Sequence, residues 1–287
     1  MTDLPRFGQY AAVPRQEQCP RHPGSSAVGY CKRCNRPTCA ECTIPTEVGS
    51  ICVDCAKGSS RRSPLKGNLS GAPVATYAIL IVTVGLYFLD MVWPSIGDYL
   101  AFNPVLAYFQ PWRFVTVSLV HAGFFHIMFN MLMLYLLGAN AERMIGHWRF
   151  LSLYVLSSVG GSVASLVWVL ADPASITTWT VGASGAIYGL LGAVLVDQLR
   201  ARANPTSILI LLGINLMYSF TVGGISWQGH LGGLIVGSLV AWMYSAMSRP
   251  RQGVTQRRQN TWEILGTLAV VAVLVGITFA AYQPLLV

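Results

Sequence analysis

Seven long apolar runs follow one another between residues 73 and 282 of the 287-residue chain. The hydrocarbon core of a bilayer is about 30 Å thick, and a helix of about 20 apolar residues crosses it. Only 10% of the residues are charged, whereas soluble proteins contain about 25%. The sequence therefore predicts an all-α, multi-pass membrane protein, with spans at 73–93, 114–139, 150–171, 181–196, 207–223, 227–247 and 264–282.

The fourth run, 181–196, is short for a full crossing, because a helix rises only about 1.5 Å per residue. Such a helix begins below the membrane surface, so we expect its N-terminus to lie in a recess. The loop before the second run is rich in aromatic side chains, which suit the interface between lipid and water.

Basic residues predict the orientation of the spans. The first 70 residues contain no apolar signal sequence, so we expect the N-terminus in the cytoplasm. Every basic residue except Arg113 then falls on the cytoplasmic side, as the positive-inside rule requires. Seven spans put the C-terminus outside the cell membrane. Because the bases cluster before the first span and at the ends of the runs, no nucleic-acid partner is expected.

All seven cysteines lie before the first span and, with one histidine, form four pairs of two-residue spacing. Eight such ligands suit two tetrahedral zinc ions, and so short a segment needs metal to fold. Because protein ligands fill every coordination position, the zinc is expected to be structural. One candidate role of the module is to contact a cytoplasmic protein partner. The pairs are Cys19 and His22, Cys31 and Cys34, Cys39 and Cys42, and Cys52 and Cys55; whether alternate or sequential pairs share an ion stays open.

Polar residues inside apolar runs are costly in a membrane and mark candidate functional sites. Ser184 opens the short fourth run within the sequence GASG, and His230 lies in the sixth. Histidine is the usual base that activates a serine hydroxyl, while His126 and Asn130, one helical turn apart, suit an oxyanion hole. No carboxylate is placed as a third member, which favours a Ser–His dyad. The alternative is that these side chains serve helix packing.

Taken in order, these residues resemble the rhomboid family of intramembrane serine proteases. The resemblance extends from about residue 73 to residue 247 and implies a six-helix core, to which the seventh span adds one C-terminal helix. Gly229 stands where the family usually has alanine. The matching residues are Trp112, Arg113, His121, His126, Asn130, Glu142, Arg143, Gly146, Gly182, Ala183, Ser184, Gly185, Tyr188, His230, Gly233 and Gly237.

The resemblance implies a role for each site residue. Ser184 is expected as the nucleophile and His230 as its general base, without any cofactor for catalysis. The oxyanion hole is expected from His126, Asn130 and the Ser184 amide. Residues expected to shape the site are Gly182, Tyr188, Gly233 and Gly237, while Trp112, Arg113, Glu142 and Arg143 are expected to be structural.

The cysteine module resembles a B-box-type zinc finger. That resemblance implies one ion on Cys19, His22, Cys39 and Cys42, and a second on Cys31, Cys34, Cys52 and Cys55. The expected segments are a disordered N-terminus at 1–18, the two-zinc module at 19–56, a basic linker at 57–72, the catalytic core at 73–247, a basic cytoplasmic loop at 248–261, and the seventh span with the C-terminus at 262–287.

The rhomboid resemblance implies an endopeptidase that cleaves transmembrane segments of other proteins within the lipid bilayer. One alternative is a non-proteolytic rhomboid-like protein that binds membrane clients, which the presence of both Ser184 and His230 disfavours. Another is a transporter or channel gated by the zinc module, which the lack of a chain of intramembrane carboxylates disfavours.

Overall fold

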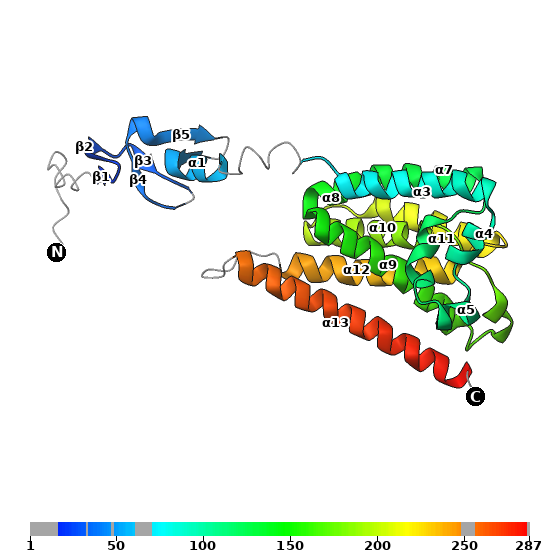
Figure 1. Cartoon of the computed structure of the whole chain (residues 1–287). Helices are drawn as coiled ribbons and strands as arrows, with labels where there is room; N and C mark the ends of the chain where they lie inside the picture. The colour runs from blue at the N-terminus through cyan, green and yellow to red at the C-terminus, as the bar shows by residue number, and fades with distance from the viewer. Residues whose placement is uncertain (1–16, 33, 47–48, 61–70, 248–255, 286–287) are drawn as a thin grey trace. The chain divides into compact units, whose positions relative to one another are not determined.

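A computed structural model describes residues 17–32, 34–46, 49–60, 71–247 and 256–285. The chain divides into two compact units, Met1–Leu69 and Ser70–Val287 (Figure 1). Most of the predicted disordered N-terminus, 1–18, lies outside the described residues, but its last residue already belongs to a strand. The predicted linker, 57–72, is also shorter than expected, because a helix extends to Ser60.

The first unit is small and has little apolar core. Its described residues form three two-stranded antiparallel sheets: β1 (Gln18–Cys19) with β2 (His22–Ser26), β3 (Gly29–Tyr30) with β4 (Pro37–Thr38), and β5 (Thr43–Thr46) with β6 (Gly49–Cys52). Helix α1 (Val53–Ser60) follows. Among the described residues of this unit, every buried hydrophobic side chain is a cysteine. Such an interior cannot stabilise a fold by hydrophobic burial alone.

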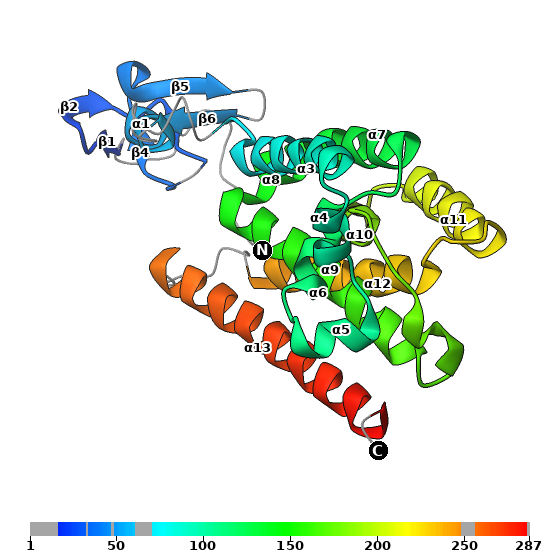
Figure 2. The same ribbon diagram turned by 45° about the vertical axis from the view of Figure 1, so that its right-hand side comes forward.

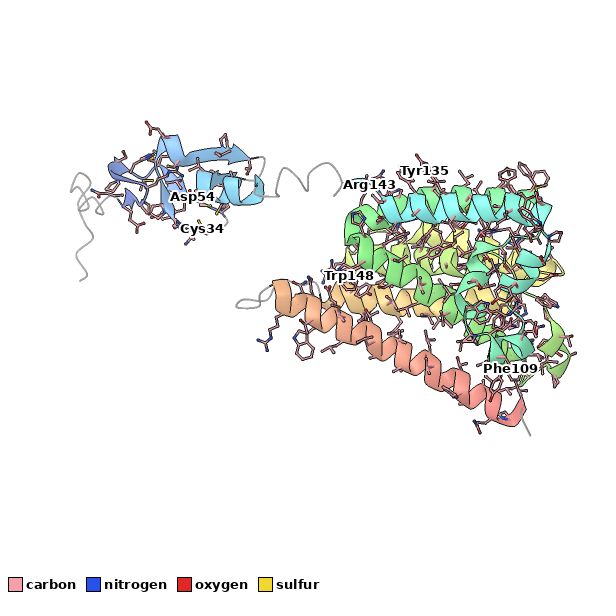
Figure 3. The ribbon with its side chains drawn as sticks, in the orientation of Figure 1. Cys34, Asp54, Phe109, Tyr135, Arg143 and Trp148 are labelled. Carbon is pink, nitrogen blue, oxygen red and sulfur yellow. The ribbon has the colours of Figure 1, made fainter. Side chains whose placement is uncertain are left out.

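The second unit is a bundle of apolar helices, and the prediction of a multi-pass membrane protein is confirmed. Among its described residues, five helical segments are long and apolar enough to cross a membrane, and α11 is a shorter apolar helix. The bundle consists of α3 (Val74–Val92), α7 (Phe124–Met133), α8 (Ala139–Ile145), α9 (His147–Trp168), α10 (Ser184–Arg200), α11 (Thr206–Thr221), α12 (Trp227–Met247) and α13 (Gln256–Tyr282). A π-helical segment, η3 (Leu134–Gly138), joins α7 to α8. Exposed side chains such as Phe109 and Tyr135 point away from the bundle (Figure 3), as a lipid-facing surface requires.

Helices α9, α10 and α12 form the centre of the bundle (Figures 1 and 2). Glycines let α10 and α12 approach until their backbones touch. A Cβ atom at Gly233 would lie 2.0 Å from the carbonyl oxygen of Gly185, and one at Gly237 would lie 2.2 Å from the Cα of Gly189. Small residues at a helix–helix contact permit this close packing inside a membrane.

The predicted second span, 114–139, is wrong at its start. Residues 113–119 instead form the short helix α6 (Arg113–Thr116) and the 3-10 turn η2 (Val117–Leu119), and the spanning helix begins at Phe124. The buried Arg113 guanidinium explains the difference, because it donates hydrogen bonds to the carbonyl oxygens of Asp98 and Ala101. These bonds hold α6 in the preceding loop, which also contains α4 (Ser95–Leu100) and α5 (Pro104–Phe109).

The predicted cytoplasmic loop, 248–261, is also shorter than expected, since α13 is already helical from Gln256. Residues 248–255 lie outside the described part of the chain. The buried carboxylate of Glu263 pairs with Arg149 of α9 at 2.6 Å, which anchors the polar first turns of α13. At the other end of α13, the Tyr282 hydroxyl donates to the carbonyl oxygen of Pro104 at 2.7 Å. Helix α13 is therefore anchored to the bundle near both of its ends.

Glu142 has a structural position, as the resemblance implied. Its buried carboxylate accepts hydrogen bonds from the backbone N–H groups of Ala75 and Thr76 at 2.8 and 2.7 Å. These groups lie in the first turn of α3, where backbone N–H groups lack intrahelical partners. A carboxylate there also interacts favourably with the helix dipole.

Candidate active site

Ser184 and His230 lie in hydrogen-bonding contact. Ser184 is the first residue of α10, and His230 lies in the first turns of α12. The Nε2 atom of His230 is 2.8 Å from the Oγ atom of Ser184. The glycine contact between Gly185 and Gly233, described above, brings these two helices together one residue after Ser184 and three after His230. The pair thus depends on close backbone packing.

A glycine-dependent loop leads into Ser184. Gly182 has a φ of +122°, a backbone conformation that residues other than glycine rarely adopt. A Cβ atom there would also lie only 2.7 Å from the Nε2 atom of His126. The loop is held by an antiparallel bridge between Phe102 and Thr180, with N–H to O distances of 2.9 and 2.8 Å. The backbone N–H of Ala183 donates to His121 Nε2 at 3.3 Å.

The side chains predicted for the oxyanion hole lie beside this loop. His126 and Asn130 both come from α7 and line the same cavity as Ser184. The Asn130 amide donates one hydrogen bond to the carbonyl oxygen of His126 at 2.8 Å, which leaves its second N–H available. At the start of α10, backbone N–H groups have no intrahelical acceptor. Candidate donors from α7 and α10 thus line the cavity that contains the Ser184 hydroxyl.

Two further side chains fix the imidazole of His230. The ring of Tyr188 stacks on it, with ring centroids 4.2 Å apart and planes 13° from parallel. On the far side of the ring from Ser184, the Oγ atom of Ser219 is 2.7 Å from Nδ1. The sequence interpretation missed Ser219. Its signal was present, because Asn215 and Ser219 are polar residues one helical turn apart in the apolar fifth run.

A cavity of about 960 Å³ contains the Ser184–His230 pair. Its walls come from α7, α9, α10, α11 and α12 and from the loop before α10. Polar side chains of α9, among them Ser158, Ser162 and Ser165, face it. These polar side chains in an otherwise largely apolar wall give the cavity hydrogen-bonding partners for water.

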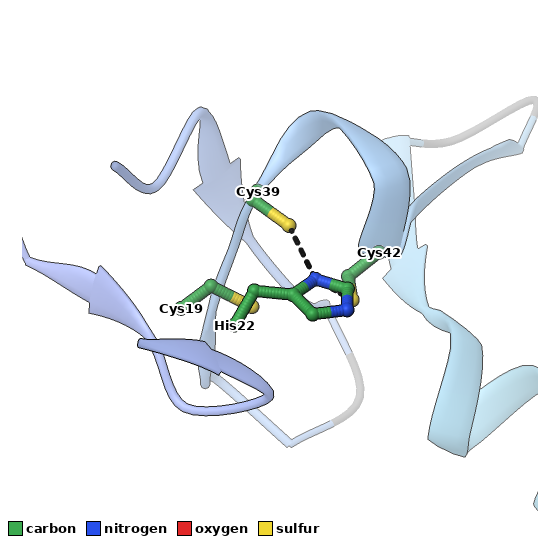
Figure 4. A group of neighbouring side chains, drawn as sticks. All are labelled: Cys19, His22, Cys39 and Cys42. Atoms are coloured by element: carbon green, nitrogen blue, oxygen red, sulfur yellow. Dashed lines mark hydrogen bonds between the residues drawn. The ribbon is translucent and has the colours of Figure 1, made fainter. Parts of the chain in front are cut away.

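The first unit brings the eight Cys and His residues into two groups. One consists of Cys19, His22, Cys39 and Cys42 (Figure 4), and the other of Cys31, Cys34, Cys52 and Cys55. Within each group the candidate ligand atoms all lie within 4.8 Å of one another. His22 Nδ1, for example, is 3.3 Å from Cys39 Sγ (Figure 4). The structure thus groups alternate pairs, the arrangement that the B-box resemblance implied.

The thiols in these groups fit a bound cation. Burial raises the pKa of Cys42 to about 11, and hydrogen bonds with Cys52 and Cys34 raise the pKa of Cys55 to about 12. A backbone hydrogen bond from Cys39 lowers the pKa of Cys19 to about 6. Neighbouring thiolates therefore do not all form at neutral pH unless a cation compensates their charge. All seven cysteines are free thiols, so both groups can bind metal.

Comparison with known proteins places this site in a family. A model of the rhomboid domain matches residues 108–247, which include Ser184, His230 and the other active-site residues described above apart from Phe102. Rhomboid protease GluP of Bacillus subtilis is 33% identical over 226 residues, which are 75% of this chain but 43% of GluP, so the chain spans less than half of that relative. The rhomboid relative YdcA, also of B. subtilis, is 31% identical over 180 residues, 60% of this chain and 88% of YdcA. Rhomboid protease AarA of Providencia stuartii is 26% identical over 206 residues, 61% of this chain and 73% of AarA. The chain belongs to the rhomboid family.

Proposed function

We propose that the chain is an intramembrane serine endopeptidase that cleaves transmembrane segments of other membrane proteins. The observation that carries this proposal is the 2.8 Å contact between His230 Nε2 and Ser184 Oγ inside a cavity of the membrane unit. Histidine at this distance is placed to accept the serine proton as general base. Relatives named as rhomboid proteases further support the assignment.

The reaction has two halves. Ser184 Oγ attacks the scissile carbonyl while His230 takes its proton, and the negative oxygen that forms is stabilised by the Ser184 amide with His126 and Asn130. Protonated His230 then gives its proton to the leaving amine, which yields an acyl-enzyme. Water then enters the cavity and attacks the acyl carbonyl while His230 takes one of its protons. His230 returns that proton to Ser184 Oγ as the C–O bond to the acyl group breaks, which releases the acid product and restores the enzyme.

The substrate must unwind locally before it can react, because the backbone groups of a transmembrane helix are already paired. We expect substrates with weak helices and small residues near the scissile bond. In our proposal residues 73–247 form the catalytic core, the N-terminus faces the cytoplasm and the C-terminus lies outside. Two structural zinc ions, on the two Cys and His groups of the first unit, would supply the folding energy that its small core lacks.

Cleavage in reconstituted liposomes tests this function. The full-length protein is mixed with a panel of single-span membrane polypeptides, and the products are identified by mass spectrometry. We expect paired fragments from the wild type and from Ser207→Ala, a control serine exposed at the start of α11. The fragments should be absent with Ser184→Ala and with His230→Ala. Equal cleavage by Ser184→Ala would refute the proposal, and polypeptides that stay bound but uncut in every variant would favour the client-binding alternative.

A further inference from the structure

Ser219 contacts His230, the candidate base, from a helix that contains neither residue of the catalytic pair. Its side chain is 3% exposed and lies in α11, whereas His230 lies in α12. The Ser219 Oγ atom is 2.7 Å from His230 Nδ1 and 2.8 Å from the carbonyl oxygen of Asn215. The Tyr188 hydroxyl lies 3.4 Å from the same Oγ atom. Three polar groups thus converge on one serine hydroxyl.

The donors in this network can be assigned from simple hydrogen-bond chemistry. A hydroxyl has one proton and two lone pairs, and a carbonyl oxygen can only accept. The short distance to the Asn215 carbonyl therefore assigns the Ser219 proton to that bond. The Ser219 oxygen is then left to accept from the N–H at Nδ1 of His230, and its second lone pair faces the Tyr188 hydroxyl.

We propose that Ser219 is a positioning residue that holds His230 in the tautomer protonated at Nδ1. That tautomer leaves the lone pair of Nε2 facing the Ser184 hydroxyl, as a general base requires. The inference rests on the proposed protease function and adds a third member to its Ser–His pair. It also explains how a neutral group can take the place that a carboxylate holds in many soluble serine proteases.

A neutral third member suits this location. A carboxylate in the interior of a membrane helix bundle carries a large desolvation penalty, whereas a hydroxyl bonded to its own helix does not. When His230 takes the serine proton, its Nδ1–H bond to Ser219 becomes charge-assisted and therefore stronger. Ser219 thus stabilises the transition state more than the resting enzyme, and its loss should lower the rate more than substrate binding.

Labelling by a fluorophosphonate probe measures this effect without a known substrate, because the probe reacts with an activated serine. With the full-length protein in detergent, Ser219→Ala should slow labelling of Ser184 by about 10- to 100-fold, the range expected for losing a hydrogen bond to a charged group. Ser219→Thr keeps the hydroxyl and should recover most of the rate. Thr221→Ala is the matched control, since Thr221 is exposed on the same helix and donates to the Met217 carbonyl.

Nitrogen NMR of the protein with 15N-labelled histidine gives a readout that a purely structural role would not move. The His230 signals, assigned by their absence in His230→Ala, should show a proton at Nδ1 in the wild type and a mixture of tautomers in Ser219→Ala. Wild-type labelling rates in Ser219→Ala, or a proton at Nε2 in the wild type, would overturn the inference while leaving the protease function intact. Absence of Ser184-dependent labelling in the wild type would overturn both.

Discussion

The substitution Gly233→Ala tests whether close packing of α10 and α12 sets the distance between the catalytic side chains. The added Cβ atom would lie 2.0 Å from the Gly185 carbonyl oxygen, whereas real Cβ atoms essentially never approach another atom within 3.0 Å. This neighbour is a backbone atom and cannot rotate away, so the two helices must separate by about 1 Å. Because His230 is one helical turn from Gly233, it moves with that part of α12.

The size of the effect follows from these distances. A separation of about 1 Å along the Ser184–His230 direction breaks their hydrogen bond, which is 2.8 Å long at present. Misplacement of that size lowers reactivity by about 10²-fold, and overpacking of a core costs about 1–3 kcal/mol. Gly237→Ala makes a similar backbone collision, with Gly189, two turns from His230. It should destabilise the protein as much and slow the reaction less.

The assay combines two measurements on the same detergent-solubilised samples. The second-order rate of fluorophosphonate labelling reports the catalytic pair, and the midpoint of thermal unfolding reports the packing. Gly213→Ala is the control, because a Cβ atom at that position of α11 meets nothing within 4 Å. Wild-type labelling and unfolding in Gly233→Ala would refute the reasoning, as would equal losses in Gly213→Ala.

Three further outcomes test other parts of the structure. A strong zinc chelator should make all seven cysteines reactive to a thiol reagent, and seven unreactive thiols after chelation would contradict this. Acidification should also release the metal, because the ligands bind it in their deprotonated form. Glu263→Gln removes the charge that faces Arg149 and should destabilise the protein by about 3 kcal/mol, or roughly 6–12 °C in the unfolding midpoint. An unchanged midpoint would argue against this anchor. Tyr282→Phe deletes the hydrogen bond to the Pro104 carbonyl oxygen and should lower the free energy of unfolding by about 1 kcal/mol, while the fluorophosphonate probe still labels Ser184. Loss of labelling would mean that this contact supports the active site.

The sequence predicted the membrane helices well because hydropathy follows the main free energy of burial in lipid. The prediction failed where contacts between residues far apart in the sequence determine where a helix begins or which side chain is buried. The apolar run continues without a break from Phe114, and only the hydrogen bonds of Arg113 reveal that the first residues belong to a loop. Likewise, Glu263 reads as the polar end of a span, and only its pairing with Arg149, 114 residues away, explains why its carboxylate is buried against α9.

The candidate site shows the same division. Ser184 and His230 could be selected from the sequence because polar groups are rare and costly in apolar runs, and the structure brings them into contact. Ser219 was missed, because serine is common at contacts between membrane helices and does not stand out as a candidate functional residue. Its position against His230 depends on how α11 is rotated about its own axis, and hydropathy carries no information on that rotation.

The central claim is that His230 activates Ser184 as a nucleophile inside the membrane unit. Mass-spectrometric location of the fluorophosphonate adduct tests it most directly, with the wild type, Ser184→Ala and His230→Ala treated side by side. The account predicts one adduct on the wild-type chain, at Ser184, and none in either variant. An adduct on another serine, or undiminished labelling of Ser184 in His230→Ala, would contradict it.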